Sequence, residues 1–257
     1  YNGEYKDVTK FTKNEMFEFR KKVQMVFQDP YSALNPQKKI YTSCEEPLKT
    51  HGVSSVEERE KIMNRVLKMV NIQPDYLMRF PHEFSGGQRQ RLCIARALEV
   101  TPEVLICDEP VSALDVSIQA QVLNLMKEIQ KEMNLTYLFI AHDLSVVQYM
   151  SDRIMVMYLG KIVEVADSKA LYDEPLHPYT KALISAIPVA DIHYKKKRQV
   201  LEGEVPSPIH KPSGCAFHNR CPYCMDICKK EDPALRYHGA DGHMTACHLY
   251  DGSEVNA

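Results

Sequence analysis

Two acidic residues follow the most apolar segment of the chain. Val104–Cys107 is a continuous apolar run, as expected for a strand covered on both faces in a parallel sheet, and Asp108 and Glu109 come directly after it. Mg²⁺ prefers hard oxygen ligands, and an attacking water needs a positioned proton acceptor. The pair therefore fits nucleotide hydrolysis, with Asp108 at the metal and Glu109 at the water, although acids that only cap a strand end would look the same in isolation.

A second segment has the properties of a phosphate receptor. Ser85 is a good helix-capping residue, and it precedes Gly86, Gly87 and Gln88 at the start of a helix predicted to run to Leu98. Glycines at a helix start let an anion approach the backbone N–H groups, where the helix dipole favours negative charge. An ordinary turn before a helix is the alternative, but Gln88 and the basic residues after it favour an anion site.

The elements that must position these residues form a parallel sheet. Three short runs are predicted to be strands: Val23–Phe27, Val104–Cys107 and Tyr137–Ala141. A helical pattern between the last two predicts a right-handed strand–helix–strand crossover. Because ligands gather outside the carboxyl ends of parallel strands, four polar side chains are expected at one rim: Gln28, Asp108, Glu109 and His142.

Composition excludes several classes of protein. The chain has 257 residues, 44% hydrophobic and 26% charged, with a formal charge of -2. These values fit a globular chain and exclude collagen and coiled coil, and the near-neutral charge argues against a broad surface for nucleic acid. No apolar run approaches the roughly 20 residues that cross a bilayer.

The composition and pattern of the sequence change near residue 170. Residues 1–170 carry the α/β pattern, with a mostly helical subdomain at about 40–100, whereas residues 171–257 are proline-punctuated and contain five of the eight cysteines. We therefore predict a domain boundary near 170, followed by an irregular, cysteine-rich extension. The basic run Lys195–Arg198 is interpreted as a solvated linker.

Taken in order, the motifs resemble those of ABC-transporter nucleotide-binding subunits. The segments that carry the resemblance are Phe84–Arg91, Asp108–Pro110, Ser112–Asp115 and His142–Asp143, with Gln28 upstream. In the tail, Leu176–Thr180 and Pro212–Cys215 resemble the carboxyl-terminal extension of oligopeptide and dipeptide importer ATPases. The sequences of Val26–Ser32 and Ser112–Gln121 most resemble the second of the two ATPase subunits in those importers. The resemblance implies an α/β, RecA-like parallel-sheet ATPase core with a helical subdomain.

The resemblance also implies roles for matching residues. Asp108 would act on Mg²⁺, Glu109 would polarise the hydrolytic water, and His142 would sense the γ-phosphate. Gln28 would touch Mg²⁺ and water and couple to the membrane subunits. Residues of two further loops would serve the assembled dimer: Ser85, Gly86, Gly87 and Gln88 as the signature motif that completes the ATP site of the opposite subunit, and Asp115 in the loop between the two sites.

Four cysteines form a further candidate site. Cys215, Cys221, Cys228 and Cys247 follow the pattern C-x5-C-x6-C-x18-C. The resemblance suggests that they hold a [4Fe–4S] cluster. A tetrahedral zinc site that includes Cys221-x2-Cys224, or simply reduced thiols, are the alternatives.

One motif of the family is missing from the sequence. None of the 257 residues forms a Gly-x-x-x-x-Gly-Lys-Ser/Thr loop, and the chain starts with Tyr1. We interpret this as an N-terminal truncation. The polypeptide as given is therefore expected to bind ATP poorly and to hydrolyse it negligibly by itself.

The sequence thus predicts an ATPase subunit that energises peptide import from the cytoplasmic face of the plasma membrane, as a peripheral protein. Expected partners are a sibling ATPase, two transmembrane permease subunits and an extracytoplasmic peptide-binding protein, with no nucleic acid. The alternatives are an ABC-class ATPase of DNA repair or chromosome maintenance, and a non-catalytic regulatory subunit.

Overall fold

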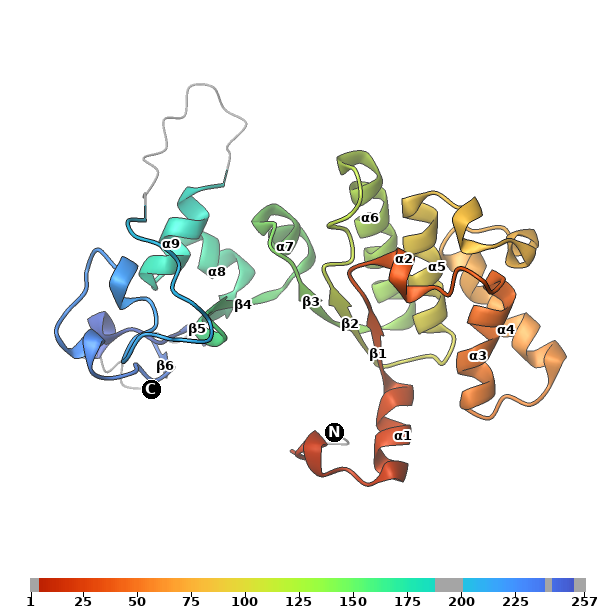
Figure 1. Cartoon of the computed structure of the whole chain (residues 1–257), viewed down its shortest axis with the longest axis horizontal. Coiled ribbons are helices and arrows are strands. Elements are labelled where there is room, and N and C mark those ends of the chain that lie inside the picture. The colour runs from red at the N-terminus through yellow and green to blue at the C-terminus, as the bar shows by residue number, and fades with distance from the viewer. Residues whose placement is uncertain (1–4, 188–200, 239–241, 252–257) are drawn as a thin grey trace. The chain divides into compact units, whose positions relative to one another are not determined.

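The computed structural model describes residues 5–187, 201–238 and 242–251. It divides into two compact units, residues 1–142 and 143–257 (Figure 1). The predicted boundary near residue 170 lies where the proline and cysteine content of the sequence changes, and not where the fold divides. It stays a prediction. The basic run Lys195–Arg198 lies outside the described residues.

The first unit contains the predicted parallel sheet. Its three strands are β1 (Val23–Val26), β2 (Val104–Asp108) and β3 (Thr136–Ile140), in the order β1-β2-β3, and both pairings are parallel. Helix α6 (Val116–Met133) connects β2 to β3. The strand–helix–strand crossover is therefore confirmed, and the three strand ends lie along one edge of the sheet.

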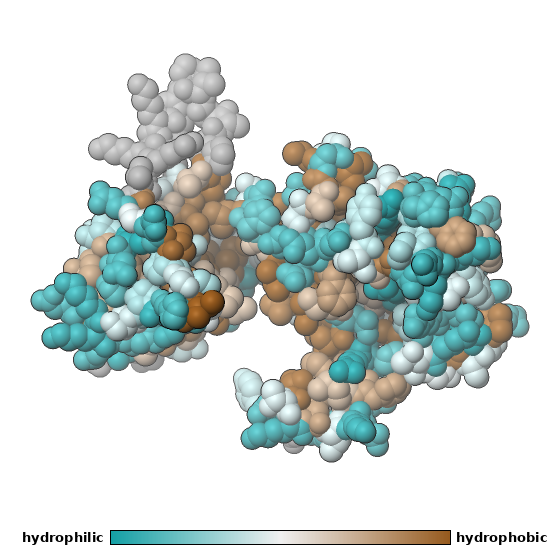
Figure 2. Space-filling model, viewed as in Figure 1, coloured by the Kyte–Doolittle hydropathy of each residue, from teal (hydrophilic) through white to brown (hydrophobic). Residues whose placement is uncertain are grey.

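Helices fill the chain between β1 and β2. They are α2 (Pro30–Ala33), α3 (Ile40–Thr50), α4 (Val56–Met69) and α5 (Gly86–Leu98), while α1 (Lys13–Lys22) precedes β1. The contacts of α5 with β1, α4 and α6 place this helix between the sheet and the other helices. Figure 2 shows mainly hydrophilic residues on the visible surface over α3–α5. No helix of the described residues has the length and apolar character needed to span a membrane.

Burial corrects one detail of the sequence interpretation. The apolar run of β2 was expected to be covered on both faces, but burial alternates along the strand. Leu105 and Cys107 are fully buried, whereas Val104 and Ile106 are only partly buried. Packing therefore fully covers only one face of β2. The other face is also apolar in sequence, but its side chains are only partly buried.

The second unit is built on an antiparallel sheet. Strands β4 (Arg153–Tyr158) and β5 (Lys161–Asp167) form a hairpin, and the turn residues Leu159 and Gly160 both have positive φ, as a tight hairpin turn requires. The tail adds β7 (Met244–Thr245) and β6 (Arg236–Tyr237), in the order β4-β5-β7-β6. The extension is thus less irregular than its sequence suggests, because it completes the sheet begun by the hairpin.

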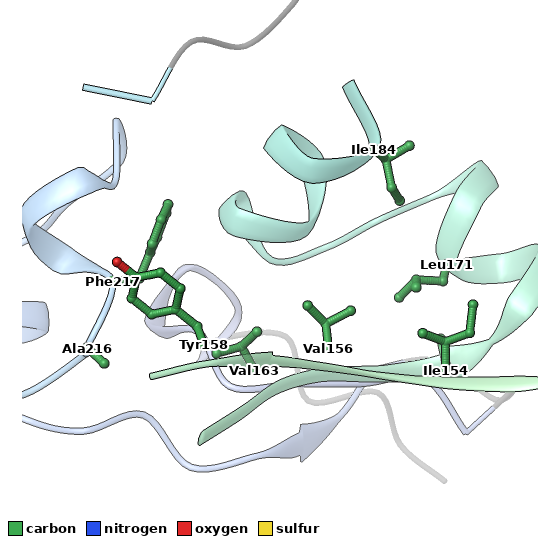
Figure 3. Close-up of a cluster of buried hydrophobic side chains, with 9 residues drawn as sticks. Ile154, Val156, Tyr158, Val163, Leu171, Ile184, Ala216 and Phe217 are labelled. Carbon is green, nitrogen blue, oxygen red and sulfur yellow. The ribbon is translucent and has the colours of Figure 1, made fainter. Parts of the chain in front are cut away.

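Three helices accompany this sheet: α7 (Leu144–Met150), α8 (Ser168–Asp173) and α9 (Pro178–Ser185). Figure 3 shows the hydrophobic cluster that joins the sheet, α8, α9 and the tail, with Phe217 of the tail beside Tyr158 of β4. The two aromatic rings meet edge to face at 5.2 Å. Other members of the cluster are Ile154, Val156, Val163, Leu171, Ile184 and Ala216.

Candidate functional site

The end of β2 presents the acid pair. Asp108 is the last residue of the strand, and the next residue, Glu109, has a φ of 43°, in the left-handed region that side chains rarely adopt. The Glu109 N–H donates to the Ile140 carbonyl at 2.9 Å, which ties the strand end to β3. The backbone thus turns sharply at Glu109, and strain of this kind is concentrated at functional sites.

Two side chains from neighbouring strand ends contact the Glu109 carboxylate. The side-chain amide of Gln28, just beyond β1, donates to Glu109 Oε2 at 2.8 Å. Nδ1 of His142, just beyond β3, lies 3.2 Å from Glu109 Oε1. The predicted convergence at one rim is confirmed for these three side chains. A carboxylate held by one group on each side has a fixed orientation, which a proton acceptor for water requires.

The predicted phosphate receptor forms a complete capping box. Ser85 Oγ accepts from the Gln88 N–H at 3.3 Å, and Gln88 Oε1 accepts from the Ser85 N–H at 3.0 Å. Gly86 and Gly87 occupy the first two helical positions of α5, and Ser85 is exposed. The first two positions of this long helix, Gly86 and Gly87, therefore carry no side chain. A helix start of this kind is suited to binding an anion.

Arg89 takes a position that the sequence did not indicate. It belongs to the basic turn after the signature, but its guanidinium is buried and donates from Nε to the Pro81 carbonyl at 2.7 Å. The guanidinium also lies 3.9 Å over the Tyr31 ring. Arg89 therefore joins the signature helix to α2, the segment that follows Gln28, and does not serve the helix tip.

Asp115 caps the helix that leaves the strand end. Its Oδ1 accepts from the Ile118 N–H at 3.1 Å and from Ser117 Oγ at 2.9 Å. The bond from Ile118 is the main cause that lowers the pKa of Asp115. The carboxylate is exposed and ionised, so it can meet a partner of positive or polar character.

A cavity of about 830 Å³ lies beside the segment that follows Gln28. Its lining includes Tyr31, Leu34, Lys38, Glu46 and Arg96. Arg96 donates to the Ala33 carbonyl at 2.6 Å, which fixes the end of α2 on the signature helix. The hollow is therefore bordered by the segment that follows Gln28 and by Arg96 of the signature helix.

The cysteine site differs from its expectation. Burial is the main cause that raises the pKa of Cys215, of Cys221 and of Cys247, the last to about 11, and neighbouring thiols raise each of these pKa values further. The thiols are therefore close enough to interact, and a metal shell would require them as thiolates.

Among the residues the structure describes, no three His, Cys, Asp or Glu side chains form a group that could hold a metal ion. All eight cysteines are free. The arrangement of Cys215, Cys221, Cys228 and Cys247 thus does not fit a [4Fe–4S] or zinc shell as it stands.

Family models match both parts of the chain. The model described as "ABC transporter" matches residues 2–112, and that described as "Oligopeptide/dipeptide transporter, C-terminal region" matches residues 163–228. The first match includes Gln28, the signature and Glu109. The second ends at Cys228.

Curated relatives extend the similarity to most of the chain. It is 55% identical to the oligopeptide transport ATP-binding protein AppF of Bacillus subtilis, over 90% of this chain and 70% of that protein. It is 47% identical to the di/tripeptide transport ATP-binding protein DppF of Pseudomonas aeruginosa, over 92% of this chain and 73% of that protein.

Among solved structures, cbiO1 of Clostridium perfringens, part of the ABC transporter complex cbiONQ, is similar with a TM-score of 0.57 and 28% identity. The similarity covers 63% of this chain and 64% of that one. It supports the expected ATPase core.

Proposed function

Because the chain belongs to the family of ATP-binding subunits of oligopeptide and dipeptide ABC transporters, we propose that it drives peptide import through the side chains gathered at the ends of β1, β2 and β3. The observation that carries this proposal is the contact of Gln28 and His142 with the two oxygens of Glu109. The DNA-repair and regulatory alternatives receive no support from these relatives.

The rim supplies two functions in this proposal. Glu109 holds the attacking water and accepts its proton, while Gln28 and His142 keep the carboxylate in place. Asp108, at the strand end beside it, supplies a hard oxygen ligand suited to Mg²⁺, which would neutralise phosphate charge when bound with ATP. The donor set at the rim fits the metal and water side of an ATP site. The phosphate-binding loop is not among the 257 residues.

The signature tip acts on a second subunit. Ser85 is exposed and Gly86 and Gln88 are partly exposed at the helix start, while Gly87 is buried beneath them, so an anion would approach this tip from the solvent side, where a partner can lie. We assign them to the nucleotide of a sibling ATPase, with Asp115 at the contact between the two sites. A heterodimer of this kind carries one site completed by this chain's signature and one that contains its Glu109.

The remaining partners follow from the transporter family. The cavity beside α2 suits a protruding segment of a permease subunit, because it adjoins both the Gln28 segment and the signature helix. Two permease subunits and an extracytoplasmic peptide-binding protein complete the assembly. The chain then sits peripherally at the cytoplasmic face of the plasma membrane.

Reconstitution tests the function directly. Vesicles that contain the two permease subunits, the sibling ATPase and a form of this protein that carries the phosphate-binding loop should accumulate a labelled oligopeptide or dipeptide only with Mg²⁺ and ATP. Omission of this chain should abolish uptake. Uptake that persists without this chain would contradict the proposal. So would a transporter that takes up another class of substrate and no peptide.

The cysteine ligand set is the finer part of the proposal. The support is the electrostatic interaction among Cys215, Cys221, Cys228 and Cys247, and the sulfurs would have to lose protons and draw together to form a [4Fe–4S] or zinc shell. Anaerobic purification with a visible spectrum and iron and zinc assays distinguishes cluster, zinc and reduced thiols. A protein free of both metals would remove the ligand role.

A further inference from the structure

The two signature glycines lie against the helix that Asp115 caps. A Cβ built on Gly87 would overlap Cγ2 of Ile118, far inside their van der Waals contact, and one on Gly86 would lie 3.5 Å from Cδ2 of Leu114. Gly87 is buried, and Ile118 is partly buried. The second glycine is therefore required within the subunit, by the Ile118 side chain, apart from any requirement set by phosphate.

The contact is rigid on both sides. Ile118 is β-branched, so its χ1 is restricted in a helix and Cγ2 cannot swing aside at low energy. The Ile118 N–H is bound to the Asp115 carboxylate, which fixes the first turn of α6. Farther along, Arg91 donates to Gln121 Oε1 at 3.1 Å and forms a second link between α5 and α6.

The same turn continues to the acid at the strand end. Ser112 donates to the Glu109 carbonyl from both its N–H and its hydroxyl, at 3.2 and 3.0 Å. The Leu114 N–H donates to the Val111 carbonyl at 3.1 Å. A short run of hydrogen-bonded backbone thus connects Glu109 to Asp115, and Ile118 carries the connection on to the signature tip.

We propose that Ile118 is a positioning residue, which couples the Asp115 turn and the signature tip of one subunit so that they move as one body. The inference rests on the proposed function for its catalytic meaning. A signature tip that serves the partner's nucleotide is then held in place by the loop that leads from this subunit's own Glu109. The two ATP sites of a dimer are mechanically linked through this contact.

Compensating substitutions test the contact without reference to catalysis. Gly87→Ala should lower the melting temperature of the chain by roughly 2 to 10 °C, because overpacking strains a rigid contact. In Gly87→Ala/Ile118→Ala the obstructing methyl is gone, and most of that loss should be recovered relative to Ile118→Ala. The control Gly87→Ala/Ile129→Ala removes buried atoms from the same helix away from the glycine, and its losses should add. Additive losses in the Ile118 pair would overturn the inference.

Turnover tests the positioning role. In the reconstituted transporter, Ile118→Ala should lower kcat at saturating ATP by about tenfold or more, since small misplacements of catalytic groups have large effects on rate. Ile129→Ala truncates a more deeply buried side chain of the same helix and should keep kcat, and Ile118→Val should keep most of it. Equal kcat in Ile118→Ala and Ile129→Ala would show that the contact is packing only and would overturn the positioning role.

The proposed function and the role of Ile118 can be contradicted separately. A wild-type transporter without ATP-dependent uptake would contradict the proposed function and leave the melting-temperature rescue intact. A fully active transporter whose Gly87 and Ile118 substitutions are additive would contradict only the inference about Ile118.

Discussion

The side-chain amide of Gln28 donates a hydrogen bond of 2.8 Å to Glu109 Oε2, across 81 residues of sequence. The pairing is possible because β1 and β2 are adjacent and parallel, with Val26 opposite Cys107, so that both strands end at the same edge. Glu109 is thereby oriented by a residue of the segment that also borders the cavity beside α2.

Glu109→Gln should arrest turnover and preserve nucleotide binding. The amide has nearly the shape of the carboxylate and can still accept a hydrogen bond from Gln28, but it cannot take a proton from water. Loss of a general base typically lowers the rate by about 10² to 10⁴-fold. Phosphate release and nucleotide binding by the reconstituted transporter measure the two effects.

A matched substitution elsewhere controls for charge. Glu128 is exposed on α6, away from the strand ends, and Glu128→Gln should leave both measurements unchanged. Full turnover by Glu109→Gln would remove Glu109 from its assigned role.

Much of the sheet and its rim could be predicted from local sequence. The apolar runs before Asp108 and His142 have the length of strands, and the pattern between them has the period of a helix, so their parallel arrangement follows. Parallel strands end at one edge, and this is why Gln28, Glu109 and His142 could be placed together without a structure. The capping box at Ser85 is likewise a local pattern.

Contacts between elements could not be predicted in the same way. The direction of Arg89, into the protein, and the fit of Ile118 against Gly87 depend on how helices pack, which no spacing records. The φ of Glu109 depends on the hydrogen bond to Ile140. Strands β6 and β7 have two residues each and exist only because β5 offers an edge, so they lack a periodic signal.

Glu99 should make the first unit less stable as pH rises. It follows α5, is 2% exposed, and neither carboxyl oxygen has a hydrogen-bond partner. Burial raises its pKa well above the ordinary value of 4.5. The folded state therefore keeps the proton while the unfolded chain loses it, so stability is full below about pH 4.5 and declines as pH rises toward the folded pKa.

Melting curves measured at about five pH values between 5 and 9 check this expectation for Glu99. Glu99→Leu should be more stable at neutral pH by about 1–3 kcal/mol, because it removes an unpaired buried polar group, and its curve should lose the decline. Glu128→Gln should retain the decline. An unchanged slope in Glu99→Leu would contradict the assignment.

His177 should make the second unit sensitive to acid. Burial lowers its pKa from 6.5 to about 4, and Nδ1 accepts a hydrogen bond from the Tyr179 N–H at 3.1 Å as the cap of α9. Protonation at Nδ1 would remove this acceptor. Because the folded pKa is depressed, the stability is full above about pH 6.5 and is lost as pH falls toward 4, on the order of 3 kcal/mol in all.

His177→Asn separates the cap from the titration. Asparagine is a good capping residue and carries no ionisable group, so this variant should lack the loss of stability between pH 6.5 and 4 that His177 causes. Thermal unfolding over that range, compared with wild type, is the measurement. If both proteins lose the same stability as the pH falls, another group is responsible for that loss.

Gly214→Ala should disrupt the cysteine-rich tail. Gly214 has a φ of +66°, and an added Cβ would lie 2.5 Å from the Cys228 carbonyl oxygen, which accepts the Cys215 N–H at 2.8 Å. Gly242 in the same unit has a φ of +68° with nothing within 4 Å of an added Cβ. Gly242→Ala therefore bears backbone strain alone, whereas Gly214→Ala adds a collision worth about 1–3 kcal/mol more.

A thiol reagent should label Cys215 and Cys228 faster in Gly214→Ala than in Gly242→Ala, because the collision separates the two backbone segments that hold these thiols. Equal labelling rates and equal melting temperatures in the two variants would mean that the Cys228 carbonyl does not constrain Gly214.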